Sequence, residues 1–339
     1  MKIDAGIETN ALTAIPDVAR EAEALGFDGL WTSEAAHNPY LPLAVAAVHS
    51  RRLELGTAIA VAFPRSPMVT AQVAWDLQAA SGGRFILGLG TQVKGHNERR
   101  FSVPWESPGP KLREMILSIR AIWDTFQNGT PLDYQGRFYR FSLMTPFFSG
   151  GPIEHPRIPI YIAGVNEYMC RLAGELCDGF HVHPFHTTRY VREFVRPLVA
   201  EGAAKTGRDP SRVALSSSVF VIAGDTEAER EPMRALVRSQ LSFYASTRTY
   251  AKILETHGWQ EIGDRLSELS RTGGWGDMPG LISDEMLEHC AVTGTWDEIP
   301  ELIRERYAGV LDRVSLYWPF VPGRDPNERW RRLVDVIHR

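Results

Sequence analysis

The feature that most constrains the fold of this 339-residue chain is a repeated alternation of short apolar strands with amphipathic helices. Segment 2–7 reads as a buried strand, and segment 15–25 then places apolar residues at helical spacing before Gly26 ends it. The segment RFILGLG at 84–90 is apolar almost throughout, as expected of a strand covered on both faces. The pattern predicts an α/β protein built on a parallel sheet.

Eight strands are predicted in total, with helices between them. The predicted strands are 2–7, 27–32, 53–61, 84–90, 158–164, 178–184, 212–224 and 313–320. The predicted helices are 15–25, 42–50, 67–82, 110–127, 168–177, 187–206, 226–245, 296–309 and 328–339. Eight such units favour a single (β/α)8 TIM barrel over residues 1–339. The alternative is a doubly wound sheet, which needs a similar pattern but fewer strands.

Two segments interrupt the alternation and are predicted to be insertions, at about 129–157 and about 246–290. The first is rich in glycine, proline and aromatic residues, as in YQGRFYRFSLMTPFF, and the second is expected to be irregular as well. Their aromatic residues predict that they shape a pocket for an apolar or extended substrate. The same residues would equally suit a subunit interface.

The composition favours a small molecule as the partner of this chain. Hydrophobic residues make up 44% and charged residues 23%, as in ordinary globular proteins. The formal charge of −4 gives no broad basic surface, which argues against nucleic acid or a membrane as partner. No stretch approaches the roughly 18 apolar residues of a spanning helix. Three cysteines and an N-terminus unlike a secretory signal predict a cytoplasmic location.

In a barrel of this type the chemistry lies beyond the carboxyl ends of the strands, so residues that follow each strand are the candidates. The second strand is followed by SEAAHNP, in which Glu34 and His37 are three residues apart. Either side chain could exchange a proton with a bound substrate. The alternative makes Glu34 a helix-start carboxylate and His37 a surface loop residue.

The fourth strand ends in GLGTQVKG, which begins like a dinucleotide-binding turn. Gly88 and Gly90 fit a G-x-G-x-x-G pattern, but Val93 occupies the place of the third glycine, so the pattern fails. Glycine at a strand end still lets a ligand approach the backbone closely. These glycines are therefore compatible with a ligand site at the end of this strand, although they do not form a dinucleotide-binding turn.

Two longer segments carry a family resemblance. TAQVAWDLQAASGGR at 70–84 precedes the G-x-G strand, and IPIYIAGVNEYMCRLAGELCDGF at 158–180 contains the fifth strand and a helix start. Together with the order of eight strands, they resemble the bacterial luciferase-like superfamily of flavin and deazaflavin oxidoreductases. Within it, the chain most resembles the branch that uses coenzyme F420. The resemblance covers nearly the whole chain and implies a TIM barrel.

The resemblance also implies which residues hold the cofactor. A non-prolyl cis peptide supports the central ring in such enzymes, and the matching bond is Ala58 to Ile59; an ordinary trans strand is the alternative. The helix start after the fifth strand would bind a phosphate, or else is simply a tight turn. The implied contacts are Ala58, Ile59, Gly90, Thr91, Gln92, Val93, His96, Ala163, Gly164, Val165 and Asn166. Arg99 and Arg100 would meet an acidic tail or face water.

Two further groups of side chains have more than one interpretation. The segment HVHPFH contains His181, His183 and His186, and His181 and His183 share one face if it begins as a strand. A metal site needs further oriented ligands, and the resemblance implies no metal. Trp318, after the eighth strand, either lines a substrate pocket or fills core space.

The function that the resemblance implies is a coenzyme F420-dependent oxidoreductase that moves a hydride between carbon five of the deazaflavin and a small organic substrate. Glu34 or His37 would handle the proton, although relatives carry the acid and histidine adjacent, whereas two alanines separate them here. The alternatives are an FMN-dependent monooxygenase of the same superfamily and a noncatalytic ligand-binding barrel or partner subunit. Homodimers are common among relatives, which makes a homodimer a further expectation.

Overall fold

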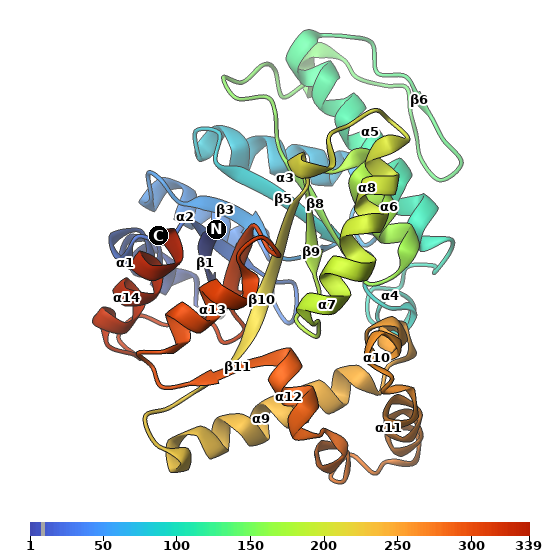
Figure 1. Cartoon of the computed structure of the whole chain (residues 1–339). Helices are drawn as coiled ribbons and strands as arrows, with labels where there is room; N and C mark the ends of the chain where they lie inside the picture. The colour runs from blue at the N-terminus through green and yellow to red at the C-terminus, as the bar shows by residue number, and fades with distance from the viewer. Residues whose placement is uncertain (8–10) are drawn as a thin grey trace.

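The computed structural model describes residues 1–7 and 11–339, and its centre is a closed barrel of eight parallel strands (Figure 1). The barrel strands are β1 (Lys2–Ile7), β2 (Gly29–Thr32), β3 (Glu54–Thr57), β5 (Phe85–Gly90), β8 (Ile160–Gly164), β9 (Gly179–Val182), β10 (Ala214–Ala223) and β12 (Arg313–Leu316). Each pairs with the next in this order, and β12 pairs with both β10 and β1, which closes the ring. The predicted (β/α)8 TIM barrel is confirmed.

Helices surround the barrel, and their ends follow from local sequence. The Ser66 side chain accepts a hydrogen bond from the Val69 amide where α3 begins, and Gly26 ends α1 with a φ of +93°. The outer helices are α1 (Ile15–Leu25), α2 (Tyr40–His49), α3 (Pro67–Ala80), α5 (Pro108–Asn128), α6 (Glu167–Leu176), α7 (Thr188–Tyr190), η3 (Val191–Val195), α8 (Arg196–Ala204), α13 (Ile299–Tyr307) and α14 (Asn327–His338). No helix in the described ranges combines the length and apolar character needed to cross a membrane.

The third predicted strand is broken in the structure. It was expected to run continuously over 53–61, but β3 ends at Thr57 and a short strand β4 (Ala60–Val61) continues beside β5. The peptide bond between Ala58 and Ile59 is cis, at the position where the resemblance places one. The Ala58 amide donates to Thr32 O at 2.7 Å. A bulge therefore stands at the carboxyl end of β3.

Gly88 and Gly90 make room for this bulge. The Thr57 hydroxyl donates to Gly88 O at 2.7 Å and accepts from the Gly88 amide at 2.9 Å. A Cβ at Gly88 would lie 1.7 Å from Thr57 O, and one at Gly90 would lie 2.7 Å from the Ile59 side chain. The space beside both glycines is filled by the barrel wall, so packing explains them without a coenzyme. A backbone contact from Gly90 to a cofactor stays a prediction.

Replacing Gly88 with alanine should destabilise the fold by about 3 kcal/mol or more, because the new methyl group meets backbone atoms that cannot move aside. Urea unfolding followed by circular dichroism measures the loss. Gly6→Ala is the matched control, since Gly6 also lies in a barrel strand and a Cβ there meets nothing within 4 Å. Equal urea midpoints for the two variants would contradict the close contact between Gly88 of β5 and Thr57 of β3.

The inside of the barrel at the amino ends of the strands holds a buried charge cluster. The Arg313 guanidinium donates to both oxygens of Asp4, at 2.8 and 2.7 Å, and also donates to Glu54. Arg313 lies 5.2 Å from the ring of Trp31, which is on a strand that does not neighbour β12. Side chains from non-neighbouring strands meet only inside the barrel, so this cluster fills its amino-terminal layer.

The first insertion lies outside the barrel wall. It contains the hairpin β6 (Tyr134–Gln135) and β7 (Arg140–Phe141) and the 3-10 turn η2 (Pro146–Phe148). The Glu114 carboxylate of α5 accepts from the Phe138 amide at 2.8 Å, and the Trp75 indole of α3 donates to Gly151 O at 3.0 Å. The insertion joins a helix to a strand, so it begins and ends at the amino end of the barrel. Its hairpin reaches back along α5, where Arg137 donates to Glu106 just before that helix begins, so its part in shaping the pocket stays a prediction.

The second insertion is helical rather than irregular. After α9 (Glu227–Ala245) come η5 (Arg248–Tyr250), α10 (Ala251–His257), α11 (Gln260–Thr272), η6 (Met278–Leu281) and α12 (Asp284–Cys290). The chain then returns as a strand that was not predicted, β11 (Ala291–Gly294), which pairs with the far end of β10. These helices lie beyond the carboxyl ends of the strands, at the bottom of Figure 1. We call this end of the barrel the mouth.

Candidate active site at the barrel mouth

Glu34 holds the loop after β2 against the bulge. Its side chain is only 6% exposed and accepts from the Arg65 guanidinium with both oxygens, at 2.7 and 2.9 Å. The same carboxylate accepts from the Val61 amide at 2.7 Å. A carboxylate that accepts three hydrogen bonds, two of them from a cation, holds the chain on both sides of it in place. Glu34 therefore lies at the mouth, as predicted. Its hydrogen bonds to Arg65 and to the Val61 amide hold it in place there.

His37 is exposed in the loop that follows Glu34. No hydrogen bond joins the two side chains within the described ranges, so the structure does not bring them together as a pair. The Arg100 guanidinium donates to Ala35 O in this loop. From the sequence, Arg100 was expected to contact the acidic tail of a cofactor or to face water. Of the two side chains, His37 is thus the one that is accessible to a ligand.

Residues 91–93, between β5 and the next helix, form a loop with a defined conformation, which we call the lip. Gln92 has a φ of +58°, and its side-chain oxygen accepts from the Val93 amide at 3.0 Å, just before the short helix α4 (Lys94–Arg99). Buried Asn97 donates to Thr91 O at 2.9 Å and to Val93 O at 3.1 Å. Sequence reasoning missed Asn97, which fixes the lip, because the short helix α4, of which Asn97 is the fourth residue, was not predicted. His96 is exposed on the same helix.

The start of α6 is built as an open turn. The Asn166 side chain accepts from the Met169 amide at 3.0 Å, and Tyr190 donates its hydroxyl proton to Val165 O at 3.1 Å. Ala163, Gly164 and Val165 are partly exposed at the end of β8. The first amides of a helix have no intrahelical acceptor, so this turn offers donors to an anion at the mouth.

The three histidines of HVHPFH enter three different environments. His181 lies inside the barrel with its ring 5.1 Å from that of Trp31, and burial lowers its pKa to about 3. His186 packs between the barrel and Tyr307, and burial lowers its pKa to about 4. His183 lies at the mouth. Across the described ranges, no three or more histidine, cysteine or acidic side chains are arranged to hold a metal ion.

A cluster of polar aromatic side chains at the mouth was not found from the sequence. The hydroxyl oxygens of Tyr244 and Tyr317 are 2.7 Å apart, and the Tyr250 hydroxyl is 3.1 Å from Nε2 of His183. The rings of His183 and Tyr244 are 4.5 Å apart, which joins the two pairs. We call His183, Tyr244, Tyr250 and Tyr317 the tyrosine–histidine array. Trp318 is half-buried beside Tyr317, at the predicted place, with ring centroids 5.1 Å apart.

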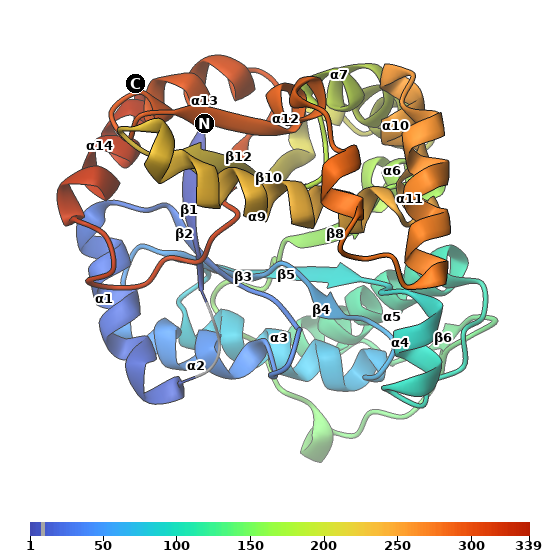
Figure 2. The same cartoon turned by 90° about the horizontal axis from the view of Figure 1, so that it is seen from below.

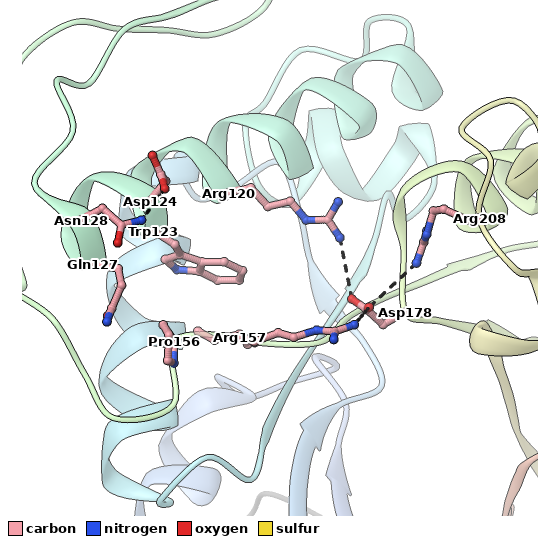
Figure 3. Close-up of a pocket in the computed structure, with 10 residues that line it drawn as sticks. Arg120, Trp123, Asp124, Gln127, Asn128, Pro156, Arg157, Asp178 and Arg208 are labelled. Carbon is pink, nitrogen blue, oxygen red and sulfur yellow. Dashed lines mark hydrogen bonds and ion pairs between the residues drawn. The ribbon is translucent and has the colours of Figure 1, made fainter.

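The opposite end of the barrel holds a cavity of about 470 Å³, shown in Figure 3, in which three arginines converge on one aspartate. The guanidinium groups of Arg120, Arg157 and Arg208 lie 3.7, 3.4 and 3.9 Å from the carboxylate of Asp178, which precedes β9. Arg120 and Arg208 also donate to carbonyl oxygens at the carboxyl end of α6. This cluster ties α5, α6 and the amino end of β9 together and lies far from the carboxyl ends of the strands, which form the mouth.

Comparison with known proteins finds relatives that match nearly the whole chain. An uncharacterised protein of Mycobacterium tuberculosis is 46% identical over 93% of this chain and 92% of its own. The 5,10-methylenetetrahydromethanopterin reductase of Archaeoglobus fulgidus is 29% identical over 87% of this chain and 86% of its own. The structure of the coenzyme F420-dependent tetrahydromethanopterin reductase of Methanopyrus kandleri superposes with a TM-score of 0.78, at 21% identity, over 100% of this chain and 99% of that one.

The chain also matches the model of a whole protein family. Residues 1–313 match the family of luciferase-like monooxygenases. The match covers the first seven barrel strands and ends at the first residue of the eighth, β12. The match spans the bulge, the lip after β5 and the start of α6, the three features that shape the mouth. By this match and by its barrel, the chain belongs to the luciferase-like family.

Proposed function

We propose that this protein is a coenzyme F420-dependent oxidoreductase that transfers a hydride between the deazaflavin and a small organic substrate. The observation that carries the proposal is end-to-end similarity to an F420-dependent reductase, combined with a mouth that keeps a bulge after β3 and an open helix start after β8. An FMN-dependent monooxygenase is the second candidate, because the family is named for monooxygenases and a Baeyer-Villiger monooxygenase of similar fold binds FMN.

The residues at the mouth fit a deazaflavin nucleotide. The amides at the start of α6 are hydrogen-bond donors at the positive end of a helix, which suits a phosphate. Glu167 in that first turn is paired with Arg171 at 2.9 Å, which offsets its repulsion of an anion. The bulge at Ala58 and Ile59 and the lip at Thr91, Gln92 and Val93 would support the ring system from two neighbouring strands.

When bound, the deazaflavin supplies a hydride donor or acceptor at carbon five. The protein's part is to hold ring and substrate together and to keep the ring in one orientation. Glu34 contributes indirectly, since its bonds to Arg65 and Val61 fix the bulge. His37 is the better candidate of the two for proton exchange with solvent. We also propose that the protein forms a homodimer and takes a small molecule as its substrate.

A binding titration separates the two cofactors. Purified protein should bind oxidised F420 at least about tenfold more tightly than FMN, which corresponds to about 1.4 kcal/mol. The phosphate-free deazaflavin riboside is the matched control ligand, and it should bind at least about tenfold more weakly than F420 because it leaves the α6 amides without an acceptor. Fluorescence quenching measures all three affinities.

Three outcomes are distinguishable. Tight FMN binding with no F420 binding would overturn the proposed cofactor and favour the monooxygenase. F420 binding that is insensitive to loss of the phosphate would remove the role given to the α6 start. F420 binding with no reduction by secondary alcohols or reduced donors in single-turnover mixing would instead support a noncatalytic binding barrel.

A further inference from the structure

The tyrosine–histidine array faces the axis of the barrel. Along β12, Arg313 and Ser315 point inward, because Arg313 bonds Asp4 and the Ser315 hydroxyl lies 2.8 Å from that of Ser218. The Tyr317 amide donates to Val219 O at 2.9 Å, so the pairing of β12 with β10 continues to this residue. Side chains alternate along a strand, and Tyr317 is therefore the next inward side chain, at the level of the mouth.

The array lies across the mouth from the bulge. Around the barrel, β3 and β10 are separated by four steps in either direction. The array comes from the ends of β9 and β12, which flank β10, and from α9 and η5, which follow it. In Figure 2, which looks at the mouth, α9 crosses the half that contains β10 and β12, while β3 and β4 lie in the other half. A deazaflavin ring bound against the bulge would therefore have the array on its other face, where the substrate would bind.

The hydrogen bonds of the array leave two hydroxyl protons for a ligand. Nδ1 of His183 accepts from the Phe185 amide at 3.1 Å, and burial lowers the pKa of His183 to about 3, so the ring is neutral at pH 7. A neutral imidazole carries one N–H, which must then lie on Nε2 and donate to the Tyr250 oxygen. Tyr250 keeps its own proton. In the Tyr244 and Tyr317 pair, one hydroxyl donates to the other and the second proton is left over.

These donors are uncharged and remain so. Burial raises the pKa of Tyr250 to about 12 and raises that of Tyr317 well above its usual range, so both stay protonated in neutral solution. Gln240 is the other polar group beside Tyr244. Within the described ranges, no lysine or arginine bonds to any of the four side chains. Neutral donors without a cation suit a neutral oxygen acceptor better than a carboxylate or a phosphate.

We propose that the tyrosine–histidine array binds the oxygen of a carbonyl substrate, or of the matching alcohol, and that Tyr317 delivers the proton during reduction. The inference rests on the proposed function, since it needs a reduced deazaflavin as hydride donor. The carbonyl carbon gains the hydride and forms a C–H bond while the C=O π bond breaks. The substrate oxygen takes the Tyr317 proton and forms an O–H bond. Tyr317 regains a proton from Tyr244, which recovers one from water.

A chromophoric aldehyde tests this without turnover. The absorption of 4-(dimethylamino)cinnamaldehyde moves to longer wavelength when its carbonyl oxygen accepts a hydrogen bond, so its spectrum on the F420-loaded enzyme reports the array directly. We expect the shift in the wild-type enzyme. We expect it to be lost in Tyr317→Phe, with affinity for the probe about tenfold weaker. Tyr139→Phe is the control, because Tyr139 is a partly buried tyrosine of the first insertion, outside the barrel.

The outcomes either support or overturn the assignment. A shift present in the wild type and in Tyr139→Phe but absent in Tyr317→Phe supports it. An unchanged shift in Tyr317→Phe, or no shift in the wild type at saturating probe, overturns it. F420 binding is measured on the same samples by fluorescence. Failure of the wild type to bind F420 would refute the proposed function. Normal F420 binding together with the same spectral shift in Tyr317→Phe as in the wild type would refute only the role proposed for the array.

Discussion

Replacing Arg313 with methionine should lower the free energy of unfolding by about 3 to 5 kcal/mol. Arg313 is 3% exposed and Asp4 is 2% exposed, so the substitution leaves a buried carboxylate without its two guanidinium hydrogen bonds. Asp4 cannot turn to water, because it lies in the amino-terminal layer inside the barrel. Urea unfolding at pH 7 gives the change directly.

The matched control for this loss is Arg332→Met. Arg332 makes a comparable ion pair with Glu301 on the surface, and such pairs contribute little, so its removal should change stability by less than about 1 kcal/mol. The double variant Asp4→Leu with Arg313→Met should recover much of the loss, since an apolar pair needs no hydrogen-bond partner. A single Arg313→Met variant no less stable than Arg332→Met would show that the buried pair does not stabilise the barrel.

The protein should lose stability steeply as the pH falls below about 6.5. His181, His183 and His186 are buried, and their folded pKa values lie near 3, 3 and 4, below the ordinary 6.5. The unfolded chain therefore takes up protons first. Stability is fully present above pH 6.5 and decreases as the pH falls towards the folded values, by up to about 1.4 kcal/mol per pH unit for each histidine.

Unfolding midpoints at pH 7.5, 6.0 and 5.0 measure this slope. His186→Gln should make the slope shallower by the contribution of one histidine, because it removes one of the three buried imidazoles. The range stops at pH 5 so that carboxylates contribute little. A stability that stays flat from pH 7.5 to 5.0 would mean that these histidines are protonated as easily in the fold as in the unfolded chain.

Much of the barrel was predictable from sequence for a physical reason. Parallel strands covered on both faces are apolar throughout, so segments such as 84–90 stand out against their surroundings. The same property hid the break between β3 and β4, because Ala58 and Ile59 are as apolar as their neighbours. The helices of 246–290 were missed although Ile262, Leu266 and Leu269 have helical spacing in α11, because six glycines divide this segment into short pieces.

The candidate site was predictable only where its residues follow a strand directly. Glu34 was placed at the mouth for that reason, whereas Thr91 and Gly164 were assigned to the site by the family resemblance. The bond from Glu34 to Arg65 spans 31 residues, and that from Tyr244 to Tyr317 spans 73, so no local pattern could indicate either. The tyrosine–histidine array draws its members from the ends of two strands, a helix and a 3-10 turn, and only the closed barrel brings them together.

The way β11 returns to β10 has a consequence for how the covering helices are attached to the barrel. The segment 224–290 leaves β10 after Ala223 and comes back at Ala291, which pairs with Phe220 of the same strand. Its two ends are therefore anchored side by side on one rigid strand, as in sites that accept whole domains. The covering helices therefore form a separable unit that is attached to the barrel at two adjacent points, while the bulge after β3, the lip after β5 and the start of α6 all lie outside it.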